Sequence, residues 1–268
     1  MSSQSTSWCV SAFQAWRLLD YWITVYRRTW RGTVITSFVN PLLYVVAMGV
    51  LLGGFVHADP QELEGAASYL QFVVPGLLAA QSMQVAIGEV TYPVMGMLKW
   101  DRTYYSMAAT PLRVVDLVLA HLGFVTVRLT LTSTVFVSVL APFGVFDSVA
   151  GAVGAGAVQL LIGLAFAALI YAYSATLRSE AGFTIVFRLL VIPLTLFSGA
   201  FFPLANLPAP LETVARATPL WQGVSLTRSF ALGTTETGSV VLHLSYLIVM
   251  VVLGLWFSVR QLSKRLQF

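Results

Sequence analysis

The chain has 268 residues, of which 57% are hydrophobic and only 10% are charged, with a formal net charge of +4. A soluble domain carries about 25% charged residues, so this composition excludes a water-soluble globular protein. The abundance of apolar residues also excludes a disordered chain, and the single cysteine, Cys9, excludes an internal disulfide. The composition therefore predicts a protein whose surface faces lipid.

Residues 8–31 have the pattern of an amphipathic helix. Aromatic and apolar side chains recur at steps of three or four, among them Trp16 and Trp22, while Arg17 and Arg27 fall on another face. Such a helix suits the membrane interface. We expect it either to anchor the chain before the first span or to dock a partner, and the pattern leaves both open.

Long apolar stretches predict six transmembrane helices within one domain at residues 32–268. A helix needs about 20 apolar residues to cross a bilayer core of about 30 Å, and six stretches meet this requirement with few charges. The predicted fold is an all-α membrane protein with spans at residues 33–56, 69–95, 113–141, 148–177, 182–202 and 239–260.

The basic residues predict the orientation of these spans. Twelve of the 15 Lys and Arg residues fall before the first span, in alternate loop regions and in the tail, when Arg113 and Arg188 near the ends of spans are counted with the loops beside them. Two fall in the other loops, and Arg128 lies inside a span. Because loops rich in Lys and Arg remain on the cytoplasmic side, we expect both termini to be cytoplasmic.

Three ionisable residues inside the predicted spans are candidates for intramembrane or gate positions: Glu89, Arg128 and Arg188. Charges in hydrocarbon usually mark function or a buried pair. Glu89 is interpreted as either structural or substrate-contacting, with pairing to Arg128 as one option, and Arg188 can instead reach the inner headgroups. The isolated His121 and His243 are expected to be packed or interfacial rather than parts of a proton relay.

The segment at residues 203–235 is too interrupted by proline to span the membrane and too apolar for an ordinary loop. Irregular backbone at membrane depth needs shielding by protein or by a wet cavity. We expect a re-entrant helical hairpin, in which two short helices enter the outer leaflet and return. The alternative is a helix that lies flat on the outer surface. Trp221 and Arg228 are gate candidates in this segment.

The sequence lacks the motifs of an ATPase or another enzyme. It has no phosphate-binding loop of the type G-x-x-x-x-G-K-[ST], no Ser/His/Asp or Cys/His set, and no acidic cluster suited to a metal. We therefore predict a membrane conduit or scaffold that is not an enzyme and holds no cofactor or metal of its own. Chemical energy is expected to enter through another subunit.

The region between the second and third predicted spans resembles the membrane subunits of ABC-2-type exporters. It contains Glu-Val-Thr-Tyr-Pro at 89–93, Leu-Lys-Trp-Asp-Arg-Thr-Tyr at 98–104 and Met-Ala-Ala-Thr-Pro-Leu at 107–112. Further similarity lies at residues 40–44, 69–78, 198–203, 207–208 and 219–220, so the likeness covers most of the chain. The chain is most similar to the branch that includes nodulation-type lipo-oligosaccharide permeases and drug-efflux permeases.

This resemblance implies a multi-pass subunit of the inner membrane. It would pair with a second permease copy or a sibling permease, above two copies of a separate ATP-binding subunit that would bind ATP and magnesium. The ATPase would contact the N-terminal helix and a coupling helix at residues 99–112. The residues implied in this contact are Trp100, Asp101, Arg102, Thr103, Tyr104, Tyr105, Arg17, Arg27 and Arg28.

The expected function is ATP-driven export of an amphipathic substrate, because the spans offer few polar groups for a hydrophilic one. A lipo-oligosaccharide, a glycolipid and a hydrophobic drug are all compatible with this pattern, and no nucleic-acid partner is expected. Tyr44, Phe72 and Phe230 are candidate substrate-facing residues. The alternatives are a stand-alone secondary transporter, which would need ion sites at mid-membrane, and a non-transporting membrane assembly factor.

Overall fold

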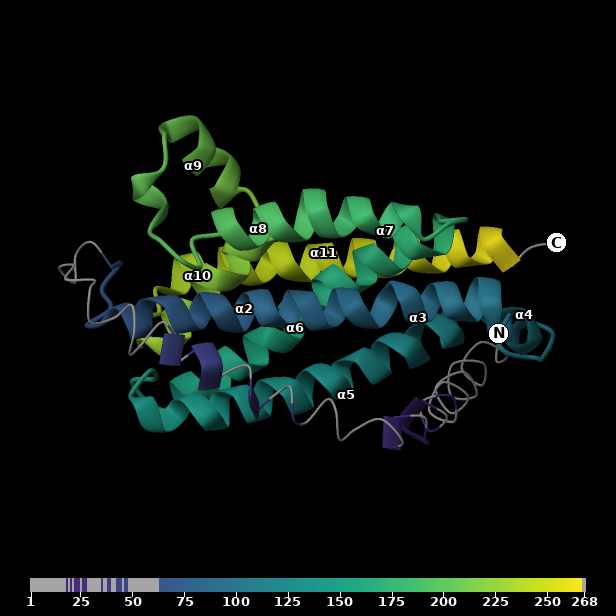
Figure 1. The fold of residues 1–268 in the computed structure, drawn as a ribbon, viewed down its shortest axis with the longest axis horizontal. Coiled ribbons are helices and arrows are strands. Elements are labelled where there is room, and N and C mark those ends of the chain that lie inside the picture. The colour runs from purple at the N-terminus through teal and green to yellow at the C-terminus, as the bar shows by residue number, and fades with distance from the viewer. Residues whose placement is uncertain are drawn as a thin grey trace, which may run out of the picture.

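The computed structural model describes residues 63–266 together with scattered residues between 18 and 47. The described part is helical throughout and contains no strand. Most of the first predicted span, at residues 33–56, lies outside the described residues, as do Arg17 and Arg28. The all-α prediction is thus confirmed for the part of the chain that the structure describes (Figure 1).

Within the described residues, four helices are long and apolar enough to cross a membrane. They run side by side, and the second of them runs opposite to the other three (Figure 1). Helix α6 packs against α2, α5, α10 and α11, so it forms the centre of the bundle. The four are α2 (Tyr69–Val90), which continues through α3 (Tyr92–Met95) and η2 (Gly96–Trp100), then α5 (Val114–Leu140), α6 (Val149–Thr176) and α11 (Thr237–Leu266).

The predicted span at 182–202 is a shorter apolar helix. It consists of α7 (Ala181–Ile185), the π-helical η4 (Val186–Val191) and α8 (Ile192–Phe197). The helix ends at Phe197 because Gly199 has a φ of 73°, a left-handed backbone conformation that stops helices and that glycine adopts without strain.

The two ends of the bundle differ in structure. One end carries α4 (Thr103–Ala108) and the C-terminal part of α11, and is called the α4 end (Figure 1). The other carries η3 (Ala141–Phe143), η5 (Leu204–Asn206), α9 (Ala209–Arg216) and α10 (Pro219–Ala231), and is called the α9 end. Helix α9 projects away from the bundle, whereas α10 packs against α2, α6 and α11.

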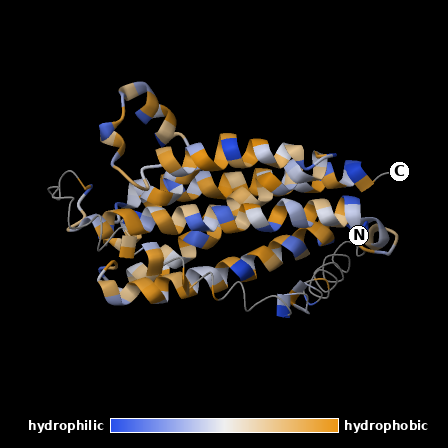
Figure 2. Ribbon diagram, viewed as in Figure 1, coloured by the Kyte–Doolittle hydropathy of each residue, from blue (hydrophilic) through white to orange (hydrophobic). Residues whose placement is uncertain are grey.

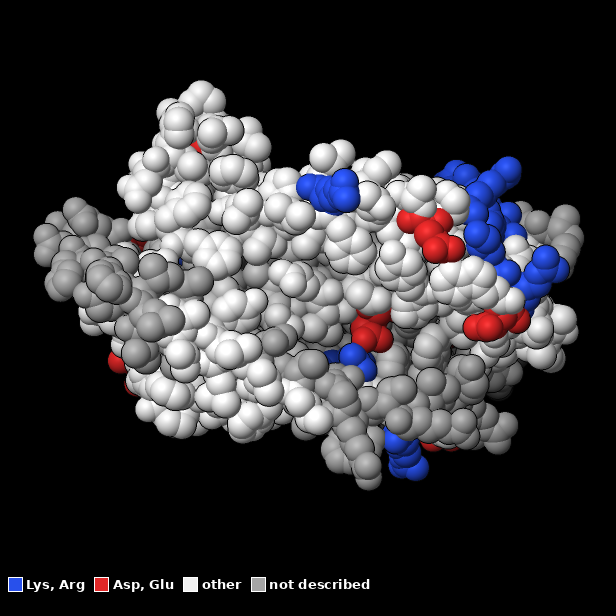
Figure 3. Space-filling model, viewed as in Figure 1, with Lys and Arg blue, Asp and Glu red and all other residues white. Residues whose placement is uncertain are grey.

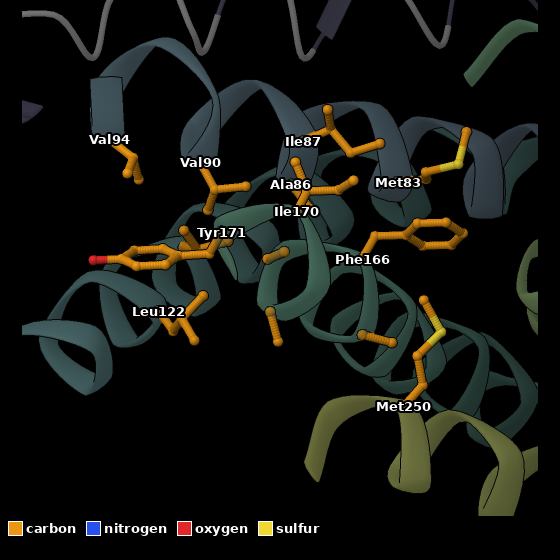
Figure 4. Packing of buried hydrophobic residues seen from close by; sticks show 14 of the residues in the cluster. Met83, Ala86, Ile87, Val90, Val94, Leu122, Phe166, Ile170, Tyr171 and Met250 are labelled. Atoms are coloured by element: carbon orange, nitrogen blue, oxygen red, sulfur yellow. The ribbon is translucent and has the colours of Figure 1, made fainter. Parts of the chain in front are cut away.

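The core lies between α2, α5 and α6, and the outer surface is also apolar. Figure 4 shows Met83 and Ile87 of α2 facing Phe166 and Ile170 of α6. Close helix contacts depend on small residues, since a Cβ at Gly254 of α11 would lie 2.9 Å from a backbone nitrogen of α6. Large apolar side chains are exposed along α11, as expected for a surface solvated by lipid, and Figure 2 shows how hydrophobic residues predominate in the helices of the bundle.

Candidate functional site

The segment predicted as one helix at 99–112 is divided in the structure. Trp100 ends η2, the continuation of α2, and α4 begins only at Thr103. Between them Arg102 has a φ of 53°, in the left-handed region. A non-glycine residue there costs about 1–2 kcal/mol, and it turns the chain sharply enough to set α4 apart from the span.

The predicted coupling residues of this segment differ in how far they are buried. Trp100 is 52% exposed, Asp101 and Arg102 are exposed, and Thr103 and Tyr105 are half-buried. Tyr104, in contrast, is only 1% exposed. The prediction that Tyr104 contacts a partner does not fit this structure, because its ring packs in the core.

The surface around Arg102 is basic. Lys99, Arg102 and Arg265 line a pocket of about 570 Å³ together with Leu98 and Tyr105. Figure 3 shows Lys and Arg side chains gathered at this end of the molecule. Such a surface attracts acidic groups on a partner.

Tyr104 belongs to a chain of buried hydrogen bonds. Tyr171 of α6 donates its hydroxyl to the Tyr104 oxygen at 2.8 Å, and the Tyr104 hydroxyl lies 2.7 Å from Nδ1 of His121 in α5. Nε2 of His121 lies 3.0 Å from the backbone oxygen of Glu89 in α2. Burial raises the pKa of Tyr104 well above its usual value, so the hydroxyl keeps its proton as a hydrogen-bond donor.

Aromatic residues of the N-terminal segment pack along the same helix. The ring of Trp22 lies 4.3 Å from that of His121, and it stacks at 5.4 Å on Phe124. Tyr26 meets Phe124 edge-on. Residues 22 and 26 are one helical turn apart, so the described part of the N-terminal segment contacts α5 along one face.

Glu89 and Arg128 form an ion pair across α2 and α5. The Arg128 Nη2 lies 2.7 Å from Glu89 Oε1, and both side chains are mostly buried, with 15% and 20% exposed. The guanidinium of Arg128 also lies 4.7 Å from the ring centre of Tyr26. An oppositely charged pair is visible in the middle of the face in Figure 3. The pairing that the sequence left open is therefore present in the structure.

At the α9 end, Arg228 of α10 joins three segments. Its guanidinium forms an ion pair with Glu64 and donates hydrogen bonds to the backbone oxygens of Phe72 and Gly199, at 3.2 and 2.8 Å. It also lies 4.1 Å above the Phe72 ring. Arg228 is only 5% exposed, so these groups, which we call the Arg228 cluster, replace its contacts with water.

Helix α10 is held by polar contacts to α6 and α11 as well. Thr227 accepts a 3.0 Å hydrogen bond from Gln159 of α6, and Gln222 is hydrogen-bonded to His243 of α11. Trp221 is half-buried, and its ring meets His243 edge-on. The expectation that His121 and His243 are packed is confirmed, since both are buried.

The remaining candidates have the following positions. Phe72 is fully buried and packs under Arg228, so its ring reaches no open surface in this conformation. Phe230 is half-buried against α6, where a Cβ at Gly154 would lie 2.6 Å from its ring. Tyr44 packs partly buried between α2 and α5, and Arg188 and Arg27 are exposed.

Sequence reasoning missed the partners of these residues. Tyr171 and Glu64 had no distinguishing pattern, and His121 was interpreted only as a packed residue. A histidine in an otherwise apolar helix was the available signal, because a buried imidazole needs partners for both ring nitrogens. Among the residues described, no cluster of His, Cys, Asp and Glu could hold a metal ion.

Comparison with known proteins places this geometry in a family context. Residues 13–232 match the family model described as ABC-2 type transporter. The chain is 30% identical to Nodulation protein J of Rhizobium leguminosarum bv. trifolii, and the match covers 91% of this chain and 94% of that protein. It is 29% identical to Nodulation protein J of Rhizobium meliloti, with the same coverage of both chains. It is 26% identical to the Inner membrane transport permease YadH of Escherichia coli, over 75% of this chain and 72% of YadH.

Proposed function

Because this chain belongs to the ABC-2 type transporter family, we propose that it is the permease subunit of an ATP-driven exporter. A separate ATP-binding subunit, present in two copies, would dock on the α4 end and hydrolyse ATP with magnesium. A second permease copy or a sibling permease would complete the gate. The family match over residues 13–232 is the observation on which this proposal depends.

We propose that the α4 end faces the cytoplasm and the α9 end faces outward, with six spans and both termini inside. The distribution of charge supports this orientation. The two arginines of the α9 end, Arg216 and Arg228, are paired with Glu212 and Glu64. At the α4 end, Lys99 pairs with Glu180 at 3.9 Å, and the same basic pocket also contains Arg102 and Arg265. An excess of positive charge is typical of cytoplasmic loops.

We propose that the outer element, α9 and α10, re-enters the membrane. Helix α10 packs within the bundle against α2, α6 and α11, and the Arg228 cluster neutralises its one cation at that depth. Helix α9 exposes Leu211 and Val214, which are 50% and 65% exposed, and such a surface suits the outer leaflet.

The substrate class that we propose is amphipathic: a lipo-oligosaccharide, a glycolipid or a hydrophobic drug. The outward surfaces are apolar, and an apolar groove of about 480 Å³ lies between α8, α6 and α9. A stand-alone secondary transporter would need ion sites at mid-membrane, and Glu89 is an acid within the spans. Its ion pair with Arg128 supports a structural role instead.

Co-purification tests the proposed function. The chain is tagged and purified from its own membranes, and the ATP-binding subunit recovered with it is measured. We expect Trp100→Ala to lower this recovery roughly tenfold, because exposed tryptophans often anchor interfaces. Arg102→Gly should also lower it, although glycine adopts a φ of 53° without strain.

Trp256→Ala is the matched control for Trp100→Ala. Trp256 is 53% exposed, almost the same as Trp100, but it lies on the lipid-facing side of α11. Recovery of the ATP-binding subunit should be unchanged in this variant. Purification of the unmodified chain without any ATP-binding subunit would contradict the proposed function, and normal recovery with Trp100→Ala would contradict the assigned surface.

A further inference from the structure

We propose that Tyr104 of α4 and His121 of α5 are positioning residues through which movement of α4 is transmitted to the spans. His121 is also the residue of α5 that both α4 and the N-terminal segment contact. This inference rests on the proposed function, since it assumes that an ATP-binding subunit moves α4. Tyr104 is buried, so a partner cannot contact it directly. Its proposed role therefore differs from that of the exposed contact residues in segment 99–112.

The hydrogen-bond chain has one consistent direction. The backbone oxygen of Glu89 can only accept, so Nε2 of His121 must carry a proton and donate to it. Nδ1 is then an acceptor, and the Tyr104 hydroxyl donates to it. Tyr171 in turn donates to the Tyr104 oxygen. Each donor has an acceptor, and the four groups come from α6, α4, α5 and α2.

Tyr104 is the buried attachment of α4. Of the six residues of α4, all of them described, only Tyr104 is buried. Its hydroxyl reaches two spans at 2.7 and 2.8 Å. Shifting α4 while α5 and α6 stay in place would leave polar groups unpaired in an apolar core, which is costly. A displacement of α4 is therefore expected to move α5 and α6 with it.

The N-terminal segment reaches the same histidine from another side. Trp22 packs against the His121 ring at 4.3 Å, and the ring of Tyr171 meets that of His121 edge-on at 5.4 Å. Seven residues along α5, Arg128 pairs with Glu89 and lies over Tyr26. Both surfaces that are proposed to contact the ATPase thus converge on one face of α5.

The test uses the full complex, in lipid nanodiscs, of this chain with its co-purified ATP-binding subunit. Cys9→Ser removes the native thiol, and Val214→Cys on α9, where residue 214 is 65% exposed, receives an environment-sensitive fluorophore. The emission change on trapping with ATP, magnesium and vanadate reports movement at the far end. The rate of ATP hydrolysis is measured in the same samples.

Tyr104→Phe keeps the ring and removes the hydroxyl. We expect hydrolysis to stay within about twofold of the parent and the nucleotide-driven emission change to fall roughly tenfold. His121→Phe keeps a ring against Trp22 and should show the same near-normal hydrolysis and reduced emission change as Tyr104→Phe. The double variant should be no worse than either single one, because the two residues share one interaction. Tyr246→Phe is the control, since it also removes one tyrosine hydroxyl, which donates to the backbone oxygen of Ala217 at the α9 end.

The outcomes separate the two proposals. A full emission change with an assembled Tyr104→Phe or His121→Phe complex would overturn the inference and leave the exporter proposal standing. An equal loss with Tyr246→Phe would also overturn it, because the loss would then reflect general destabilisation. An assembled parent complex without a nucleotide-dependent change would overturn the inference alone. If the complex contains no ATP-binding subunit, both proposals fail.

Discussion

Arg228 shows how a single cation is accommodated at membrane depth. An unpaired charge in such a position is costly, and Arg228 meets a carboxylate, two backbone oxygens and an aromatic face. Glu64 has a φ of 53°, a left-handed conformation that is unfavourable for a non-glycine residue. The ion pair with Arg228 offsets that strain. The cluster therefore fixes the start of α2 and the turn after α8 to α10.

The Arg228 cluster makes a prediction about stability. Arg228→Met should lower the free energy of unfolding by about 1–3 kcal/mol, because it removes the donor to the backbone oxygens of Phe72 and Gly199. Glu64, with 43% of its side chain exposed, can return to water. Arg216→Met removes the same kind of side chain from the exposed pair with Glu212, 56% exposed at Arg216, and should cost at most about 1 kcal/mol. Thermal unfolding of both variants, followed by tryptophan fluorescence in nanodiscs, measures the difference. Equal losses would show that Arg228 has no special structural role.

At the scale of the element, the backbone of α2 approaches another segment at one point. A Cβ added at Gly76 would lie 2.4 Å from Cα of Ala200, in the turn that follows α8. A backbone atom cannot rotate away as a side chain can, so the two segments would have to separate. Gly88, twelve residues further along the same helix, has no described atom within 4 Å of such a Cβ.

These two glycines form a matched pair for mutation. Gly76→Ala should lower the free energy of unfolding by about 1–3 kcal/mol, because the added methyl overpacks the contact with Ala200. Gly88→Ala should raise it by up to about 1 kcal/mol, because alanine is the better helix former and the space is open. Heat denaturation monitored by circular dichroism gives both values. A destabilised Gly88→Ala variant, or a neutral Gly76→Ala variant, would contradict this packing.

At the scale of the whole molecule, charge is distributed unequally between the two ends. The Arg residues of the α9 end are neutralised by ion pairs, whereas basic side chains gather at the α4 end (Figure 3). This asymmetry supports the expected orientation. Two exposed residues can report it: Thr235, between α10 and α11 at the α9 end, and Ser179, between α6 and α7 at the α4 end.

Labelling of single cysteines tests this orientation. In a Cys9→Ser background, Thr235→Cys should react in intact cells with a maleimide that cannot cross the inner membrane. Ser179→Cys should react only after that membrane is opened. The reverse pattern would place the α4 end outside and would remove the basis for docking an ATP-binding subunit there.

Part of the candidate site could be predicted from the sequence. The charges at Glu89 and Arg128 stood out in apolar stretches, and the structure joins them at 2.7 Å. The break near residue 100 was not predicted, because a left-handed Arg102 has no marker in the sequence. Tyr104 was assigned to an exposed surface, since an aromatic residue among polar neighbours gives no indication of the side to which its ring turns.

By itself the sequence determined the all-helical class and the positions of the four long apolar helices that the structure describes, and it predicts the orientation. These follow from hydrophobicity and charge, which each residue possesses wherever it lies. Only the tertiary structure decided that Tyr104 points inward, that His121 joins four helices and that Arg228 is paired. These contacts link residues 17, 67 and 164 positions apart. Which distant groups meet depends on how whole helices pack, and no local pattern contains that information.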